Sequence, residues 1–258
     1  MAILELEEVS KFFGGLASVS DLTFSVSDRR EILGLIGPNG AGKTTVFNLI
    51  TGLHRPSRGR IRFQGREIGG QKPYAICTQG IARTFQATSL FFEETVLNNM
   101  LIARHSRMNS GIWGALVVTP STAREERGAL EKSLEILEKV GLRPKANDFP
   151  HNLTSMEQRM LMIAMALMTE PSLLLLDEPS AGMSPQEALT LMHVIAKVRE
   201  WGINIILIEH DMKVVMNACD RIVVLNFGMK IAEGTPEEIR THPQVIEAYL
   251  GRRSGAAR

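Results

Sequence analysis

A glycine-rich stretch restricts this chain to very few folds. The stretch GPNGAGKTT, from Gly37 to Thr45, overlaps the end of an apolar run at 31–37 and leads into a helical segment that Gly52 stops. Its spacing is glycine, four residues, glycine, lysine and then a hydroxyl residue. A continuous apolar run is typical of a strand buried on both faces. The sequence therefore predicts a buried parallel strand, a glycine loop and a helix in direct succession.

The glycine loop is suited to hold a chain of phosphates. Glycines let the backbone wrap closely around a ligand, successive N–H groups point inward, and the helix N-terminus adds its positive end. Lys43 would reach the outer phosphates, and the Thr44 hydroxyl would bind Mg²⁺. A glycine turn that only ends a strand is the simpler alternative, but the strand, loop and helix context favours a phosphate site. The predicted binding residues are Gly37, Pro38, Asn39, Gly40, Ala41, Gly42, Lys43, Thr44 and Thr45.

Two acids and a histidine follow other apolar runs. Asp177 and Glu178 end the stretch that begins at Leu173, and His210 comes directly after INIILIE. Open α/β sheets bind ligands at the carboxyl ends of their strands, so we expect these side chains near the glycine loop. Asp177 would hold Mg²⁺ through water, and Glu178 would polarise a water for attack on a γ-phosphate. His210 would contact that phosphate or that water.

The order of apolar runs predicts a parallel sheet covered by helices. Runs rich in Ile, Leu and Val at 173–177, 203–209 and 221–226 are separated by helical stretches at 185–201 and about 211–219. Such alternation is the mark of an α/β fold. Near the N-terminus, AILELEEV, LTFSVS and RIRFQG alternate polar with apolar residues, as half-buried strands do.

The middle of the chain has a different pattern. From about Thr95 to Leu142 it is mostly helical, and TAREERGALEKSLEILEKVGL carries apolar residues at helical spacing. The segment 105–121 has no clear period, so we expect a loop or an insertion there. The sheet-forming halves therefore flank a helical block at roughly 87–168.

Composition excludes several classes of protein. The net charge of +1, from 29 basic and 28 acidic residues, argues against nucleic-acid binding that rests on bulk positive charge. The two cysteines form no CxxC pair, so we expect neither zinc nor a disulfide framework, and a reducing compartment is the simplest interpretation. No apolar stretch is long enough to span a membrane, and the N-terminus does not read as a signal peptide. We therefore expect a soluble chain, which another chain would have to hold at any membrane where it works.

These elements, in this order and over nearly the whole chain, resemble the ATP-binding cassette (ABC) ATPases. The resemblance implies an α/β P-loop NTPase core of the RecA-like kind, with a mostly parallel sheet, an antiparallel β subdomain and an inserted helical subdomain. It implies one domain over 1–258, with a nucleotide-binding core at 1–86 and 169–258. The helical subdomain would be 87–168. ATP and Mg²⁺ are the implied cofactors.

The same resemblance assigns further roles. Gln86 in RTFQ matches the glutamine that reaches Mg²⁺ and the attacking water. Phe13 in KFFGG matches the aromatic residue that stacks on adenine, with Phe12 as the alternative, and either ring could instead belong to the core. Glu178 matches the catalytic carboxylate, and His210 matches the switch histidine. Residues 180–185 match the D-loop.

The segment LTSMEQ departs from the family pattern. ABC proteins usually carry LSGGQ here, which binds the γ-phosphate of the ATP held by the opposite subunit, and the matching residues include Thr154, Ser155, Met156 and Glu157. Both glycines are absent. One interpretation is a capped helix start alone, since Thr-x-x-Glu is a capping box. The other is that the helix N-terminus still offers N–H groups to a phosphate. Met156 stands where the family has a glycine that permits close approach of the backbone to the phosphate.

Several stretches, among them FGGLASVSDLTFSV, LIEHDMKVVM and VIEAYLG, look like the ATP-binding subunits of branched-chain amino-acid importers. That group implies an ATPase on the cytoplasmic, inner face of the cell membrane. Its partners would be permease subunits, a second ATP-binding subunit (a copy or a paralogue) and an external solute-binding protein, with no nucleic acid. Alternatives are urea or amide uptake, lipopolysaccharide export or a soluble ABC protein without a permease. A GTPase would need [NT]KxD, which we do not find.

The segment that follows Gln86 has two open interpretations. Leu90, Phe91 and Phe92 lie where a short helix of the membrane subunit docks in this family. Exposed aromatic side chains would suit such a groove. Alternatively, these side chains pack into the helical block.

Overall fold

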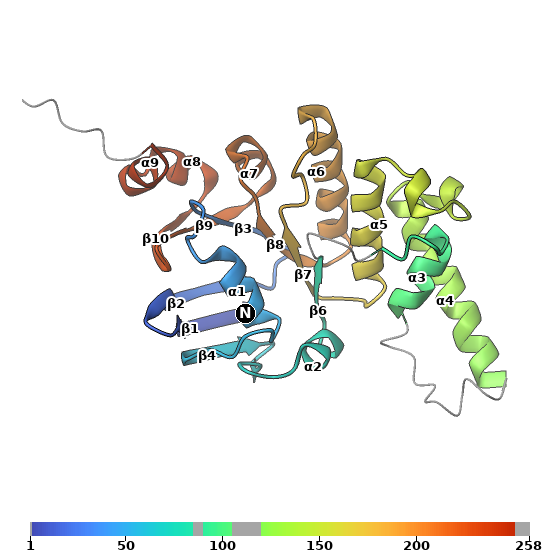
Figure 1. Cartoon of the computed structure of the whole chain (residues 1–258), viewed down its shortest axis with the longest axis horizontal. Helices are drawn as coiled ribbons and strands as arrows, with labels where there is room; N and C mark the ends of the chain where they lie inside the picture. The colour runs from blue at the N-terminus through green and yellow to red at the C-terminus, as the bar shows by residue number, and fades with distance from the viewer. Residues whose placement is uncertain (1, 85–89, 105–119, 251–258) are drawn as a thin grey trace, which may run out of the picture.

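The computed structural model describes residues 2–84, 90–104 and 120–250 (Figure 1). Its larger sheet has six strands in the order β10-β9-β3-β8-β7-β6. The pairs from β9 to β6 are parallel, whereas β10 pairs with β9 in the antiparallel sense. The strands are β3 (Ile32–Ile36), β6 (Ile81–Thr84), β7 (Leu173–Asp177), β8 (Asn204–Ile208), β9 (Arg221–Asn226) and β10 (Met229–Gly234).

The smaller sheet is antiparallel, with four strands in the order β2-β1-β4-β5. Its strands are β1 (Ala2–Phe13), β2 (Leu16–Ser27), β4 (Arg58–Phe63) and β5 (Arg66–Glu67). Helix α1 (Lys43–Ile50) lies between the two sheets in Figure 1, and its Val46 and Phe47 are fully buried there. The alternating patterns near the N-terminus therefore form a second layer over the parallel sheet.

Successive residues of the central strands point to opposite faces of the sheet, as strand geometry requires. Leu175 of β7 and Ile206 of β8 belong to the core shared with α1 and the antiparallel sheet. Leu174 and Leu207 belong to the core under the other helices. These strands are buried on both faces, which explains why they read as unbroken apolar runs.

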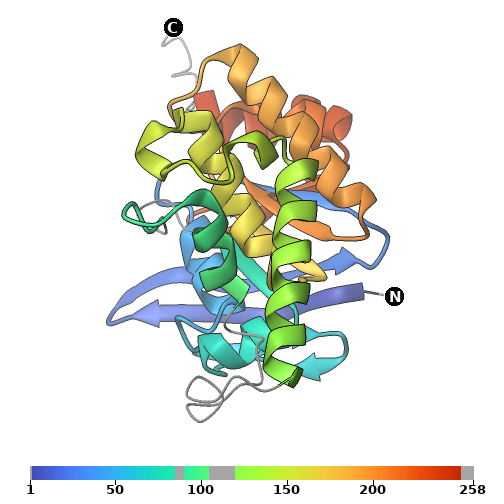
Figure 2. The same cartoon turned by 90° about the vertical axis from the view of Figure 1, so that its right-hand side faces the viewer.

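The second core is covered by helices from the middle and the end of the chain. Figure 2 shows α4 nearest the viewer, with α3 beside it and α5 behind. Among the residues that the structure describes, no helix combines the length and apolar character needed to cross a bilayer. The helices are α2 (Pro73–Thr78), α3 (Val96–Arg104), α4 (Pro120–Lys139), α5 (Ser155–Leu167), α6 (Pro185–Glu200), α7 (Met212–Ala218), α8 (Pro236–Thr241) and α9 (Pro243–Leu250), with short 3₁₀ turns at Arg143–Lys145 and Pro150–Asn152.

Most predicted elements are confirmed to within a few residues, but some were missed. Elements β6, β10, α2, α8 and α9 were not predicted from the sequence, because they are short or half exposed. The unassigned segment at 105–121 falls outside the described residues except for its last two, which begin α4. The division into a core and a helical block remains a proposal, since α5 shares one buried cluster with the parallel sheet.

We predict that Leu207→Ala lowers the free energy of unfolding by about 2–5 kcal/mol, because it leaves a cavity in the centre of the sheet. Leu207 has no exposed surface. The matched control is Leu189→Ala on α6, where the leucine is 48% exposed. That change should stay within about 0.5 kcal/mol. Urea denaturation of both variants measures the difference, and equal losses would contradict this account of the core.

Candidate nucleotide site

The glycine loop joins β3 to α1 and closes around a lysine. Lys43 is 6% exposed, and its Nζ donates to the carbonyl oxygens of Gly37 at 2.6 Å and Pro38 at 3.0 Å. A Cβ on Gly37 would lie 2.2 Å from a backbone oxygen of β9, and one on Gly42 would lie 2.5 Å from the Ser18 oxygen of β2. Neighbouring strands therefore require both glycines, whatever ligand the loop holds.

A cavity of about 210 Å³ lies over this loop. It joins Lys43, Thr44 and Thr45 with Glu178 and His210, which are far away in the sequence. Thr44 is exposed, and the Thr45 hydroxyl is 2.8 Å from the hydroxyl of Ser18. The remaining lining residues are Ser18, Asn39, Gly40, Ala41 and Gly42. The structure thus brings together seven of the nine predicted loop residues, 39–45, with a carboxylate and a histidine, while Gly37 and Pro38 do not line the cavity.

The electrostatics of this cavity suit an anion. Burial lowers the pKa of Lys43, while the charges of Glu178 and Asp177 raise it. A phosphate beside Nζ would favour the charged ammonium further. The loop N–H groups and the start of α1 add to the same positive potential. The residues present therefore fit a phosphate chain.

Asp177 lies behind the cavity and does not line it. Its carboxylate is 4% exposed, and its Oδ2 is 2.7 Å from Nη2 of Arg83. Arg83 also donates from Nη1 to Oδ1 of Asn48 at 2.6 Å, and its guanidinium lies 5.3 Å from the centre of the Phe47 ring. This arginine, at the end of β6, joins the Asp177 strand to helix α1. The sequence reading did not single it out.

Glu178 and His210 form a pair at the cavity wall. His210 Nε2 and Glu178 Oε1 are in hydrogen-bond contact. Glu178 has a positive φ of 48°, a conformation that residues other than glycine adopt rarely. Its N–H donates to the Ile208 carbonyl at 2.9 Å, which fixes this turn to the end of β8. The predicted proximity of the two side chains is therefore seen.

Two predicted positions on the N-terminal side do not line the cavity. Phe13, on the antiparallel sheet, is 43% exposed. Its ring packs edge-on against the ring of His54, with 5.1 Å between the ring centroids. Phe12 is 39% exposed, so neither ring belongs to the core. An adenine-stacking role remains a prediction for either residue. Gln86 falls outside the described residues.

The LTSMEQ segment begins α5, on the opposite side of Figure 1 from the antiparallel sheet, and none of it lines the cavity. The predicted capping box is confirmed: Glu157 N–H donates to Thr154 Oγ1 at 3.3 Å, and Thr154 N–H donates to Glu157 Oε2 at 2.9 Å. Met156 is half buried and packs against the core, whereas Ser155 is exposed. The segment therefore contributes nothing to the cavity over the phosphate loop of its own chain.

Comparison with known proteins decides the family. The profile of the family described as ABC transporter matches residues 19–181. The chain is also 46% identical to the high-affinity branched-chain amino acid transport ATP-binding protein BraF of Pseudomonas aeruginosa over 250 residues, which cover 96% of this chain and 98% of that protein. This chain belongs to the ABC transporter family. It is an ATP-binding cassette and an ATPase, as the motifs predicted.

Two further relatives agree with this assignment. The protein LivG of Salmonella typhimurium, a high-affinity branched-chain amino acid transport ATP-binding protein, is 46% identical over 93% of this chain and 94% of its own length. A solved ADP conformation of an ATP-binding cassette of an ABC transporter superposes with a TM-score of 0.85 at 31% identity, covering 97% of this chain and 99% of that one. Residues 229–254 also match the profile described as branched-chain amino acid ATP-binding cassette transporter. The predicted fold class is confirmed.

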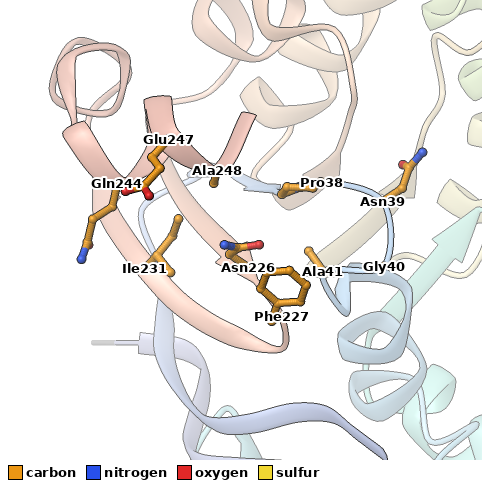
Figure 3. A pocket seen from close by; sticks show the side chains of 10 residues that line it. All are labelled: Pro38, Asn39, Gly40, Ala41, Asn226, Phe227, Ile231, Gln244, Glu247 and Ala248. Atoms are coloured by element: carbon orange, nitrogen blue, oxygen red, sulfur yellow. The ribbon is translucent and has the colours of Figure 1, made fainter. Parts of the chain in front are cut away.

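A second cavity, of about 480 Å³, lies between the cassette's phosphate loop, the turn after β9, strand β10 and helix α9 (Figure 3). Burial raises the pKa of Tyr249, and a hydrogen bond with the Gly37 backbone opposes that shift, so α9 is attached to the start of the loop. Among the residues that the structure describes, those that line this cavity include no lysine or arginine. They are Pro38, Asn39, Gly40, Ala41, Asn226, Phe227, Ile231, Gln244, Glu247 and Ala248.

We predict that Arg83→Met lowers the free energy of unfolding by about 3–5 kcal/mol, because it leaves the Asp177 carboxylate buried without its partner. In an Asp177→Asn background the loss should shrink by about 1–3 kcal/mol. Urea denaturation without nucleotide measures the free energy of unfolding of the wild type, the two single variants and the double variant, which together form a double-mutant cycle.

The matched control for this cycle is Arg62→Met. Arg62 pairs with Glu7 at the same distance of 2.7 Å, but the two side chains are 31% and 46% exposed. Its loss should be under about 1 kcal/mol. If Arg83→Met cost the same with and without Asp177, the buried ion pair would have no energetic role.

Proposed function

We propose that this cassette powers a membrane transporter that imports branched-chain amino acids or a related small solute. The observation that carries the proposal is the 46% identity to two branched-chain amino acid transport ATP-binding proteins over nearly the full length of each. The match of the C-terminal residues 229–254 points the same way. The reaction is transfer of the γ-phosphoryl group of ATP to water, which gives ADP and phosphate.

The side chains at the cavity are placed to carry out this reaction by positioning and electrostatics. The loop N–H groups and Lys43 bind the phosphates. Thr44 and Gln86 would hold Mg²⁺, and Asp177, behind the cavity, would hold it through water; the ion neutralises phosphate charge when bound. Glu178 orients the attacking water and accepts its proton. His210 holds Glu178 in place through the contact at Nε2.

A second subunit completes the site in this proposal. Thr154 and Ser155 are exposed at the start of α5 and do not line the cavity over the phosphate loop of their own chain. Two cassettes arranged head to tail would bring each α5 N-terminus to the other chain's ATP, where N–H groups and helix dipole favour a phosphate. The second subunit is a copy or a paralogue. Closure over ATP would drive the permease, and hydrolysis would reset it.

The surface after residue 89 supports docking of the membrane subunit. Phe91 and Phe92 are 49% and 41% exposed, while Leu90 packs against the core. The fully buried side chain of Asn99 accepts the Phe91 N–H at 2.8 Å and donates to its carbonyl at 3.0 Å. The aromatic pair is therefore held outward on a fixed backbone, as a docking surface on the inner face of the cell membrane requires. An external protein would deliver the solute to the permease.

We predict that cells whose own copy of this protein carries Glu178→Gln lose uptake of radiolabelled leucine, isoleucine or valine, because the amide cannot accept the proton of the attacking water. The control is Glu125→Gln, an exposed acid on α4. Uptake assays at micromolar solute measure both. If the Glu178→Gln cells take up branched-chain amino acids normally but lose uptake of a different solute, the proposed substrate class is wrong and the transport role stands.

We predict that Mg²⁺ and ATP convert purified Glu178→Gln protein from a monomer of 28.5 kDa to a dimer. Slow hydrolysis should trap the closed pair. Because Met156 packs inward, it should not need replacement. Light scattering gives the mass. If the variant binds ATP and stays monomeric, Met156→Gly is added. Rescue would then identify Met156 as the obstacle, and no rescue would indicate an obligate different partner.

A further inference from the structure

Glu209 is a buried carboxylate between the two segments that form the hydrolysis site. It follows β8, directly before His210, and is 3% exposed. Its Oε1 accepts hydrogen bonds from the N–H of Ser180 at 2.8 Å and from the Ser180 hydroxyl at 2.7 Å. Its Oε2 accepts the N–H of His210 at 3.3 Å. One side chain therefore holds the turn after β7 and the turn after β8.

Burial of this acid is hard to explain by stability alone. Desolvation raises the pKa of Glu209, and the hydrogen bonds from Ser180 and His210 oppose that shift. The charge of Glu178 raises it further. A carboxylate held by neutral donors beside a second acid is a costly way to fill a core position. Its value lies in the two directions that its oxygens fix.

Each segment held by Glu209 carries one member of the Glu178–His210 pair. Ser180 is two residues after Glu178, and His210 is the next residue after Glu209. The N–H of Glu178 also donates to the carbonyl of Ile208, at 2.9 Å. Glu178 keeps a positive φ, which persists only where the surroundings hold it. The carboxylate of Glu209 closes this ring of contacts and does not line the cavity over the phosphate loop.

We propose that Glu209 is a positioning residue that sets Glu178 against His210, and so controls the rate of hydrolysis rather than the affinity for ATP. This proposal rests on the proposed roles of Glu178 and His210. Displacing a catalytic group by about 1 Å costs on the order of 10²-fold in rate, whereas the phosphate loop makes no hydrogen bond to Glu209 in this arrangement. A change at Glu209 should therefore separate kcat from KM.

The diagnostic variant is Glu209→Gln, which keeps the shape of the side chain. Its carbonyl oxygen can still accept from Ser180, but its NH₂ group then faces the N–H of His210, and two donors repel. We expect kcat for ATP hydrolysis to fall about 10- to 100-fold. The KM and the Kd for a fluorescent ATP analogue should change much less. Glu209→Asp, which restores two acceptor oxygens, should recover part of the lost kcat.

A spectroscopic readout separates positioning from general damage. In nucleotide-free protein, the ¹⁵N resonance of the His210 ring, assigned by its loss in His210→Asn, should move in Glu209→Gln and move less in Glu209→Asp. The control is Glu200→Gln, an exposed acid at the end of α6, which should leave the resonance and the kinetics unchanged. If Glu209→Gln does not fold, the same measurements are made on Ser180→Ala, which removes the hydroxyl donor to Glu209.

Two results would overturn the inference. One is an unchanged kcat and His210 resonance in Glu209→Gln, and the other is an equal loss of kcat and ATP affinity. The proposed roles fail separately: they fall if Glu178→Gln and His210→Asn both hydrolyse ATP at the wild-type rate. A slow Glu178→Gln with a normal Glu209→Gln would reject only the role of Glu209.

Discussion

The parallel pairing of β3, β8 and β7 is the constraint on which the candidate site depends. Parallel strands end at the same edge of a sheet, so the glycine loop, Glu178 and His210 meet there although they are far apart in the sequence. Both faces of these strands are buried in separate cores, so each side chain is fixed by close packing on its own face of the sheet. The position of each reactive group is thus set by packing around the whole sheet.

Charges at that edge are held by protein groups on each side of the cavity. The ammonium of Lys43 rests on loop carbonyls, Asp177 is paired with Arg83, and Glu209 is satisfied by backbone and hydroxyl donors. Each of these groups has hydrogen-bond or charge partners within the protein, and such partners orient charged side chains at a site. The Glu178–His210 contact is the more exposed part, with a histidine side chain that is 45% exposed. The site therefore has buried, partnered charges beneath it and an exposed histidine at the cavity.

Sequence reasoning succeeded where the signal was local. The glycine spacing, the acids that follow an apolar run and the Thr154 capping box each lie within a few residues, and the structure shows each as an element or a contact. It missed Arg83 and Glu209 because their partners lie 94 and 29 residues away. Neither Arg83, in a four-residue strand, nor Glu209, directly before a histidine, belongs to a sequence pattern that predicts burial. Only the pairing of β6 with β7, and of β7 with β8, makes those contacts.

The two interpretations of LTSMEQ do not exclude each other. The capping box uses the Thr154 hydroxyl and the Glu157 carboxylate, and both partners lie along the helix start. A glycine in the usual signature matters because it adds no side chain between backbone and phosphate. A methionine whose side chain packs into the core also leaves that approach open, since the direction of a side chain decides the clash. The departure from the family pattern is therefore compatible with a phosphate at this helix N-terminus, and the same residue that looks foreign to the motif helps to anchor α5.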